Sequence, residues 1–391
     1  MTTTSPAGRR SAKATAHEQD LRRRIELARV ILISAIVFHH IRIPAELSLY
    51  TWDNLGYLRG YLQIGLLKTA TSTLTIISGY LLFSSRFELE VGGFVRKKFR
   101  TLFVPLVLWN IPLAVVIFLF HRKTHYLMKY DDLSSGSLFN WANALLGLTR
   151  EPADGSLHFL RNLIGCNIIA LAIAGIFRKH AVAVFSVILV IGVLNLQWPL
   201  VTRSDIFIGF FLGALAAATA MDAAVIDQML PLSLPSFLLS GFLIFYFQVS
   251  YESLWWIPHR FLGFLAVWPL IGWLNTRRIG EALANCSKYV FGVFLSHYYT
   301  ILLSFAVFSQ FWGLDRFYAY FLIAGPLAIG VSVAGQWVAS RYCPRLVSIA
   351  TGGRAGPSPA PRTGAGQSSG SAALSVERRT REPMSDQLLA G

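Results

Sequence analysis

The chain has 391 residues, of which 54% are hydrophobic and only 14% are charged. A soluble domain carries about 25% charged residues, and much of its surface must face water. The composition therefore argues against a soluble enzyme, a secreted scaffold or a disordered protein, and it predicts an integral membrane protein. The net charge of +15 comes from basic residues at the ends of apolar segments. Basic residues in such places flank membrane spans, so we expect no nucleic-acid partner.

The chain begins with a polar, basic segment that ends in Arg22, Arg23 and Arg24. The apolar run that follows has no small-residue cleavage site after it, so it is expected to be a retained first span rather than a signal peptide. We predict that residues 1–23 are a disordered basic cytoplasmic tail. Residues 346–391 are rich in Gly, Pro, Ser and Arg and lack apolar periodicity, so they are predicted to be a second disordered cytoplasmic tail.

Residues 24–345 contain a series of apolar runs, each close to the length of about 20 residues that a spanning helix needs. In chain order the runs are 25–43, 61–83, 102–120, 159–177, 181–197, 206–220, 234–249, 261–274, 290–309 and 318–339. The sequence therefore predicts an all-α polytopic membrane domain of about ten transmembrane helices.

The positive-inside rule orients these helices. Basic residues gather in alternate connections, first at Arg96, Lys97, Lys98 and Arg100, and later at Arg178–Lys179 and Arg277–Arg278. Both termini are consequently expected in the cytoplasm, with the long 121–158 connection outside.

Polar residues within the spans indicate chemistry, because placing them in a membrane is costly. In the first run, Arg29 and His40 are eleven residues apart, which puts them on the same helix face about 16 Å apart. Glu26 precedes Arg29 by one turn and can pair with it. An imidazole can take and return a proton near neutral pH, so His40 is a candidate general base. Interfacial anchoring of Arg29 and His40 is the alternative interpretation.

Two further segments carry candidate site residues. The basic cluster of Arg96, Lys97 and Arg100 places two cations on one helix face, suited to binding phosphate or only to fixing topology. His297 lies two turns into an apolar helix, where a histidine with a purely structural hydrogen bond is the alternative. The three cysteines are far apart and show no metal-ligand spacing, so no metal site is expected.

Taken together, these segments resemble the membrane-bound acyltransferase 3 family, from about residue 24 to residue 345. The family's opening pattern matches Glu26, Arg29 and His40, with Glu in place of the commoner Asp. Its Ser-Gly-aromatic element matches Ser78 and Gly79 with Tyr80. Its basic element before a proline is matched with Lys97 in place of the first arginine, and Phe294 replaces the usual Tyr ahead of His297.

The resemblance implies transfer of an acetyl group from acetyl-CoA to a sugar hydroxyl of an exported glycan or lipo-oligosaccharide. It implies catalysis by His40 with Arg29 and Glu26, donor binding by Arg96, Lys97 and Arg100, and support from Ser78, Gly79 and His297. Acetyl-CoA is then a donor substrate, no cofactor is held, and the protein lies in the bacterial inner membrane.

The chain is similar to the branch that acts on fucose in rhizobial nodulation factors, although exopolysaccharide is another possible acceptor. Aromatic residues of the outer 121–158 loop, namely Tyr126, Tyr130 and Trp141, are candidates for stacking on the acceptor sugar. A transporter or flippase for a lipid-linked sugar is the alternative function, because ten spans with intramembrane histidines suit it. The absence of internal self-similarity counts against that alternative.

Overall fold

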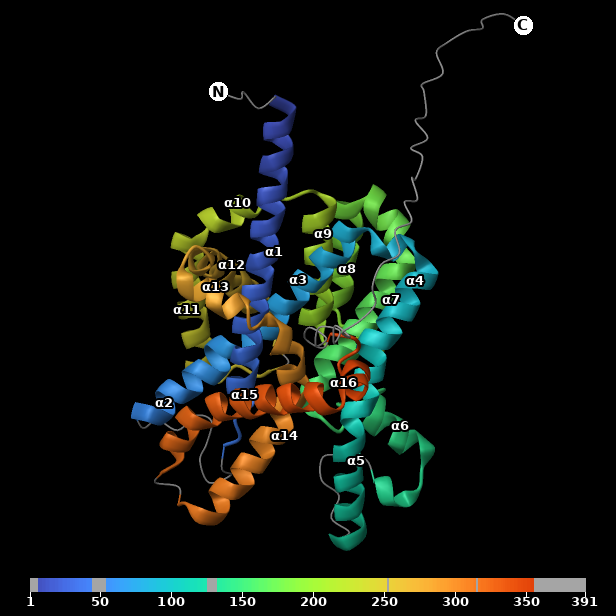
Figure 1. The fold of residues 1–391 in the computed structure, drawn as a ribbon, viewed down its shortest axis with the longest axis vertical. Coiled ribbons are helices and arrows are strands. Elements are labelled where there is room, and N and C mark those ends of the chain that lie inside the picture. Colours follow the sequence, from blue (N-terminus) through green and yellow to red (C-terminus); the bar gives the residue numbers. More distant parts are fainter. Residues whose placement is uncertain (1–5, 44–53, 125–131, 252, 314–315, 355–391) are drawn as a thin grey trace, which may run out of the picture. The chain divides into compact units, whose positions relative to one another are not determined.

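The computed structural model describes residues 6–43, 54–124, 132–251, 253–313 and 316–354 (Figure 1). Every regular element in these ranges is helical. The principal helices are α1 (Pro6–His39), α3 (Ala70–Ser85), α4 (Val91–Lys98), α5 (Val104–Thr124), α7 (His158–Lys179), α8 (Ala181–Val193), α9 (Ser204–Ala218), α11 (Leu230–Tyr246), α12 (Trp256–Asn275), α14 (Ser287–Phe311) and α15 (Phe317–Tyr342). Short helices connect them: α2 (Asn54–Gly60), α6 (Leu138–Leu146), α10 (Ala223–Gln228), α13 (Arg278–Ala284) and α16 (Pro344–Ala350). The predicted all-α fold is confirmed for these residues.

Six of the described helical stretches are long and apolar enough to cross a membrane: 56–85, 91–123, 155–179, 256–275, 287–311 and 317–342. Helices α8, α9 and α11 are apolar but shorter. With 13 residues, α8 reaches about 20 Å, whereas the hydrocarbon core is about 30 Å thick. The predicted count of about ten spans is therefore not confirmed, although each apolar run does coincide with a helix.

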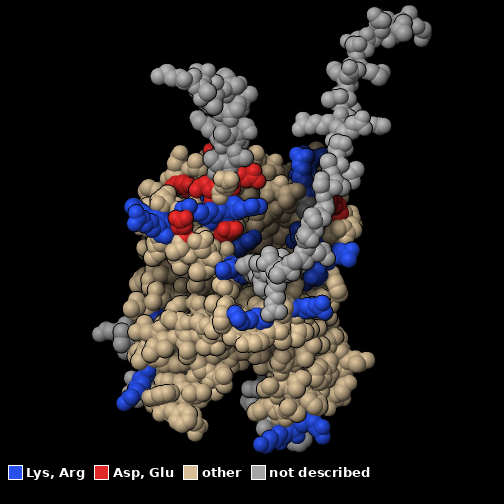
Figure 2. Space-filling view, viewed as in Figure 1, with Lys and Arg blue, Asp and Glu red and all other residues tan. Residues whose placement is uncertain are grey.

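The outer surface of these helices is suited to lipid. Large apolar side chains on α8, α11 and α15 are exposed, among them Val190, Leu239 and Leu322. On the face in Figure 2, charged side chains gather mainly toward the end at which α1 begins, and a wide area below them is largely uncharged. Since exposed apolar patches of this extent do not suit water, the multi-helix domain is a multi-pass membrane protein.

Helix α1 packs against α3, α12, α13, α14 and α15, and its side chains at Leu27, Ala28 and Val37 are completely buried. It is also longer than the first apolar run. The helix begins at Pro6, and Asp20 accepts a hydrogen bond of 2.8 Å from the side-chain amide of Asn275. Part of the predicted disordered segment 1–23 is therefore helical, because polar contacts with the end of α12 extend the helix beyond its apolar portion.

Helices α3 and α9 lie side by side at unusually close range (Figure 1). A Cβ atom on Gly79 would lie 1.8 Å from the Phe210 carbonyl oxygen, and one on Gly213 would lie 1.9 Å from the Ile76 carbonyl oxygen. Small residues allow such backbone approach in membrane helix pairs. The predicted supporting role of Gly79 thus has a physical basis in the packing of α3 on α9.

The chain remains ordered beyond residue 345, where the predicted second tail begins. Helix α16 packs against α5, and the Trp109 indole N–H donates a 3.0 Å hydrogen bond to the Ala350 carbonyl. Gly352 then takes a left-handed φ of 63°, which directs the chain toward Thr101. The boundary at 346 was therefore wrong by at least nine residues, because a polar, glycine-containing segment finds partners on α5. The rest of the predicted tail lies outside the described residues.

Candidate active site

His40 follows the last residue of α1, and its backbone N–H still donates to the Ile36 carbonyl at 3.1 Å. Its imidazole Nδ1 also contacts the Ile36 carbonyl oxygen, at 2.9 Å. A carbonyl oxygen can only accept, so Nδ1 carries the proton and Nε2 keeps its lone pair. This tautomer is the one that a general base needs.

His297 brings a second imidazole to the same place. It projects from α14, and the centroids of the His40 and His297 rings are 5.3 Å apart with the rings nearly perpendicular. Its Nδ1 donates to the Phe294 carbonyl at 2.7 Å, and its buried Nε2 has no partner among the described residues. The structure thus brings together two predicted site residues that lie on different helices.

His39 is held differently. Its Nδ1 contacts the Gln63 carbonyl oxygen at 3.0 Å, and the Gln63 side-chain amide lies 3.3 Å from the carbonyl of Ile41. Gln63 belongs to a π-helical turn, Tyr61–Leu66, which precedes α3. Gln63 was not predicted from the sequence, yet it fixes the end of α1 that carries His40.

The predicted cations line a large basic cavity of about 920 Å³. Its walls include Arg29 from α1, Ser78 from α3, Arg96 and Lys97 from α4, and Arg100. Glu26 lies one turn before Arg29 and acts on it electrostatically. Since Arg29 and His40 remain about three helical turns apart on α1, Arg29 belongs to this cavity and not to the histidine pair.

Several further polar residues of the basic cavity were not predicted, among them Lys98, Asn167 and Arg354. The described lining contains six cations and no carboxylate. The Arg354 guanidinium lies 4.1 Å from the centroid of the Phe291 ring. Loss of hydration, together with the positive charge of Arg29, lowers the pKa of Arg354 to about 10, so it stays charged at neutral pH. A lining with six cations and no carboxylate among its described residues suits a multiply charged anion.

A second cavity of about 670 Å³ lies farther along the same helices. Helix α7 contributes its first residue, His158, to the second cavity and Leu163 to the basic one. Helix α9 likewise contributes Asp205 to the second cavity and Phe210 to the basic one. Five helical residues span about 7.5 Å, so only a thin layer separates the two cavities along these helices.

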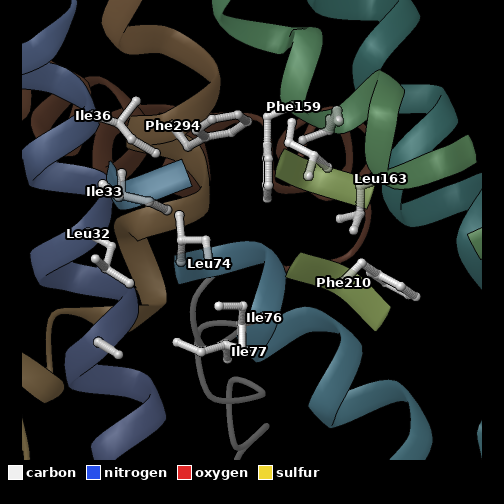
Figure 3. Close-up of a cluster of buried hydrophobic side chains, with 14 of the residues drawn as sticks. Leu32, Ile33, Ile36, Leu74, Ile76, Ile77, Phe159, Leu163, Phe210 and Phe294 are labelled. Atoms are coloured by element: carbon white, nitrogen blue, oxygen red, sulfur yellow. The ribbon is translucent and has the colours of Figure 1, made fainter. Parts of the chain in front are cut away.

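Aromatic side chains of α7 and α14 connect this region to the histidine pair. Figure 3 shows Phe159 of α7 and Phe294 of α14 facing each other, with ring centroids 5.8 Å apart. The Phe294 ring in turn lies 6.0 Å from the His297 ring. The position of Phe294, where the resembling family usually has Tyr, is therefore beside the candidate catalytic histidines.

Of the three outer-loop aromatic residues that were expected to stack on a sugar, the structure describes only Trp141, which lines neither cavity. Trp141 packs against Phe118, with ring centroids 5.6 Å apart, inside a small apolar cluster. Tyr126 and Tyr130 lie outside the described residues. The second cavity has its own aromatic residues, Trp198, Tyr251 and Trp256, which the sequence-based interpretation missed. Asp205 and Arg260, two charged residues at the edges of apolar runs, could have indicated this second cavity from the sequence.

Residues 22–338 match the family model described as an acyltransferase domain, the acyltransferase 3 family. Because the match covers most of the chain, this protein belongs to that family and is a membrane acyltransferase. The chain is also similar to the succinoglycan biosynthesis protein ExoH of Rhizobium meliloti (strain 1021), with 25% identity over 343 residues. The aligned region covers 85% of this chain and 92% of ExoH. No solved structure shows a significant match.

Proposed function

We propose that this protein transfers an acetyl group from acetyl-CoA to a sugar hydroxyl of an exported glycan. The observation that carries the proposal is that one set of packed helices holds a basic cavity, a histidine pair and a second cavity. The similarity to a succinoglycan biosynthesis protein favours an exopolysaccharide over a nodulation-factor fucose as the acceptor.

The basic cavity suits the donor. Acetyl-CoA carries several phosphate charges, and guanidinium and ammonium groups bind phosphate through strong, charge-assisted hydrogen bonds. Arg96, Lys97 and Arg100 would hold these phosphates, and Arg29 and Ser78 would border the path of the pantetheine arm. Acetyl-CoA is a cytoplasmic metabolite, so the basic cavity would open to the cytoplasm. Both termini would then lie on the cytoplasmic side of the bacterial inner membrane, as the basic connections also predict.

The histidine pair suits the transfer step. The Nε2 lone pair of His40 would accept the proton of the sugar hydroxyl as its oxygen attacks the thioester carbonyl carbon. Collapse of the tetrahedral intermediate breaks the C–S bond, and the His40 imidazolium returns the proton to the leaving sulfur. The products are the sugar ester and free CoA. Surrounding aromatic side chains exclude water, which suppresses hydrolysis of the thioester.

The test uses purified protein in lipid nanodiscs, isotope-labelled acetyl-CoA and unacetylated extracellular glycan. We expect ester-linked label on the glycan, at least a thousandfold less of it with His40→Ala, and wild-type transfer with His180→Ala at an exposed histidine. Repeating the assay with labelled succinyl-CoA in place of acetyl-CoA shows which acyl group the protein transfers. Normal glycan acylation with impaired glycan export in cells lacking the protein would support the transporter alternative.

A further inference from the structure

The second cavity contains a buried ion cluster centred on Asp205. Asp205 Oδ1 lies 2.6 Å from Arg260 Nη1 and 3.2 Å from Arg203 Nε. Asp205 Oδ2 accepts a 2.8 Å hydrogen bond from the Ser72 hydroxyl. Both oxygens of the Asp205 carboxylate are therefore engaged by residues of the protein.

Among the described residues, positive charge exceeds negative charge around this cluster. Lys68 Nζ lies 3.6 Å from the centroid of the Tyr251 ring, whose centroid is also 4.3 Å from the Arg203 guanidinium carbon. Arg150 and Glu151 also line the cavity, and the Glu151 carboxylate acts electrostatically on Arg203. The described residues here thus include four cations, Lys68, Arg150, Arg203 and Arg260, against two carboxylates, Asp205 and Glu151.

The excess is costly because the groups are removed from water. The Arg260 side chain is only 4% exposed, and its Nε has no partner among the described residues. Buried cations require a compensating anion or hydrogen-bond acceptors. This arrangement is therefore built to receive a negatively charged group from outside the protein.

The cavity is also close to the candidate catalytic histidines. His158 lines it and interacts electrostatically with His40, as does Glu151. Trp198, which is 53% exposed, lies on its wall and offers an aromatic face for a sugar ring. A ligand in this cavity would have its charged part on the arginines and another part near His40.

We propose that this cavity binds the acceptor as an anionic saccharide, whose carboxylate or phosphate group is held by Arg203 and Arg260. The inference rests on the proposed transfer reaction, because it assigns the second substrate of that reaction. The carboxylate would come from an acidic sugar, and the phosphate from a lipid-carrier linkage.

The test compares three acceptors with the same neutral oligosaccharide backbone: unmodified, with one uronic acid, and with a terminal phosphate. Binding to the nanodisc-embedded protein and transfer from acetyl-CoA are measured separately. We expect at least tenfold tighter binding of an anionic acceptor, weakened by salt. The acidic sugar and the phosphate arms distinguish the two sources of the anion.

Arg203→Gln should raise the KM for the anionic acceptor about tenfold and leave the KM for acetyl-CoA unchanged. Arg203→Lys should restore part of the affinity, and Arg345→Gln, at an exposed arginine, should change nothing. If the wild-type protein binds neutral and anionic acceptors equally, the inference is overturned. This result does not depend on whether Arg203→Gln folds. Selective anion binding without transfer instead overturns the proposed function and leaves this site standing.

Discussion

Arg354 offers a sharp test of the donor site, because it lies beyond the family-matched residues 22–338 yet lines the basic cavity. Its position depends on α16, on the Trp109 hydrogen bond to Ala350 and on the turn at Gly352. Arg354→Gln removes one of the six cations while keeping a polar side chain. The predicted consequence is weaker binding of the phosphates of acetyl-CoA.

The magnitude follows from the type of contact. A hydrogen bond to a charged group contributes about 1.5–3 kcal/mol, and about 1.4 kcal/mol corresponds to a tenfold change in affinity. The Arg354 side chain keeps exposed surface despite its partial loss of hydration, so screening favours the lower end of this range. We expect the KM for acetyl-CoA to rise about tenfold, with kcat changed by less than twofold, since Arg354 does not touch the reacting atoms.

The assay is steady-state transfer by the full chain, with two donors. Acetyl-CoA should show the tenfold effect, and acetyl-pantetheine, which lacks the phosphates, should show none. Arg345→Gln on the exposed side of α16 is the matched control. An equal loss with both donors would refute phosphate binding by Arg354 and would assign it a structural role on Phe291.

Three other predictions concern the chemistry, the packing and the topology. His40→Ala should lower kcat at least a thousandfold without changing acetyl-CoA binding by titration, whereas His180→Ala should not; residual activity above one tenth would exclude general-base catalysis. Gly79→Ala should destabilise the protein by about 1–3 kcal/mol through overpacking against α9, as measured by thermal unfolding in detergent. Gly175→Ala is the control and should stay near wild type, because the space around its Cβ is open. In a cysteine-free background, Ser135→Cys should react with an impermeant thiol reagent added outside intact cells, and labelling only after lysis would reverse the topology.

Much of the architecture was determined by the sequence alone. The low charge and long apolar runs of this chain leave helices in a membrane as the structure that satisfies every backbone polar group. The eleven-residue spacing of Arg29 and His40 likewise predicts a shared face about three turns apart, because that relation depends only on the period of one helix. The identification of Arg96, Lys97 and Arg100 as neighbours likewise needed nothing beyond local spacing.

What the sequence could not determine arises from contacts between helices. The pairing of His40 with His297 depends on how α1 packs on α14, and the close approach of α3 and α9 depends on backbone fit at Gly79. Arg354 joins the basic cavity only because α16 folds back onto α5, and Asp205 meets Arg260 only because α9 lies near α12. Helix periodicity specifies which residues share a face, but side-chain packing decides which faces meet, and that packing forms the histidine pair and the two cavities.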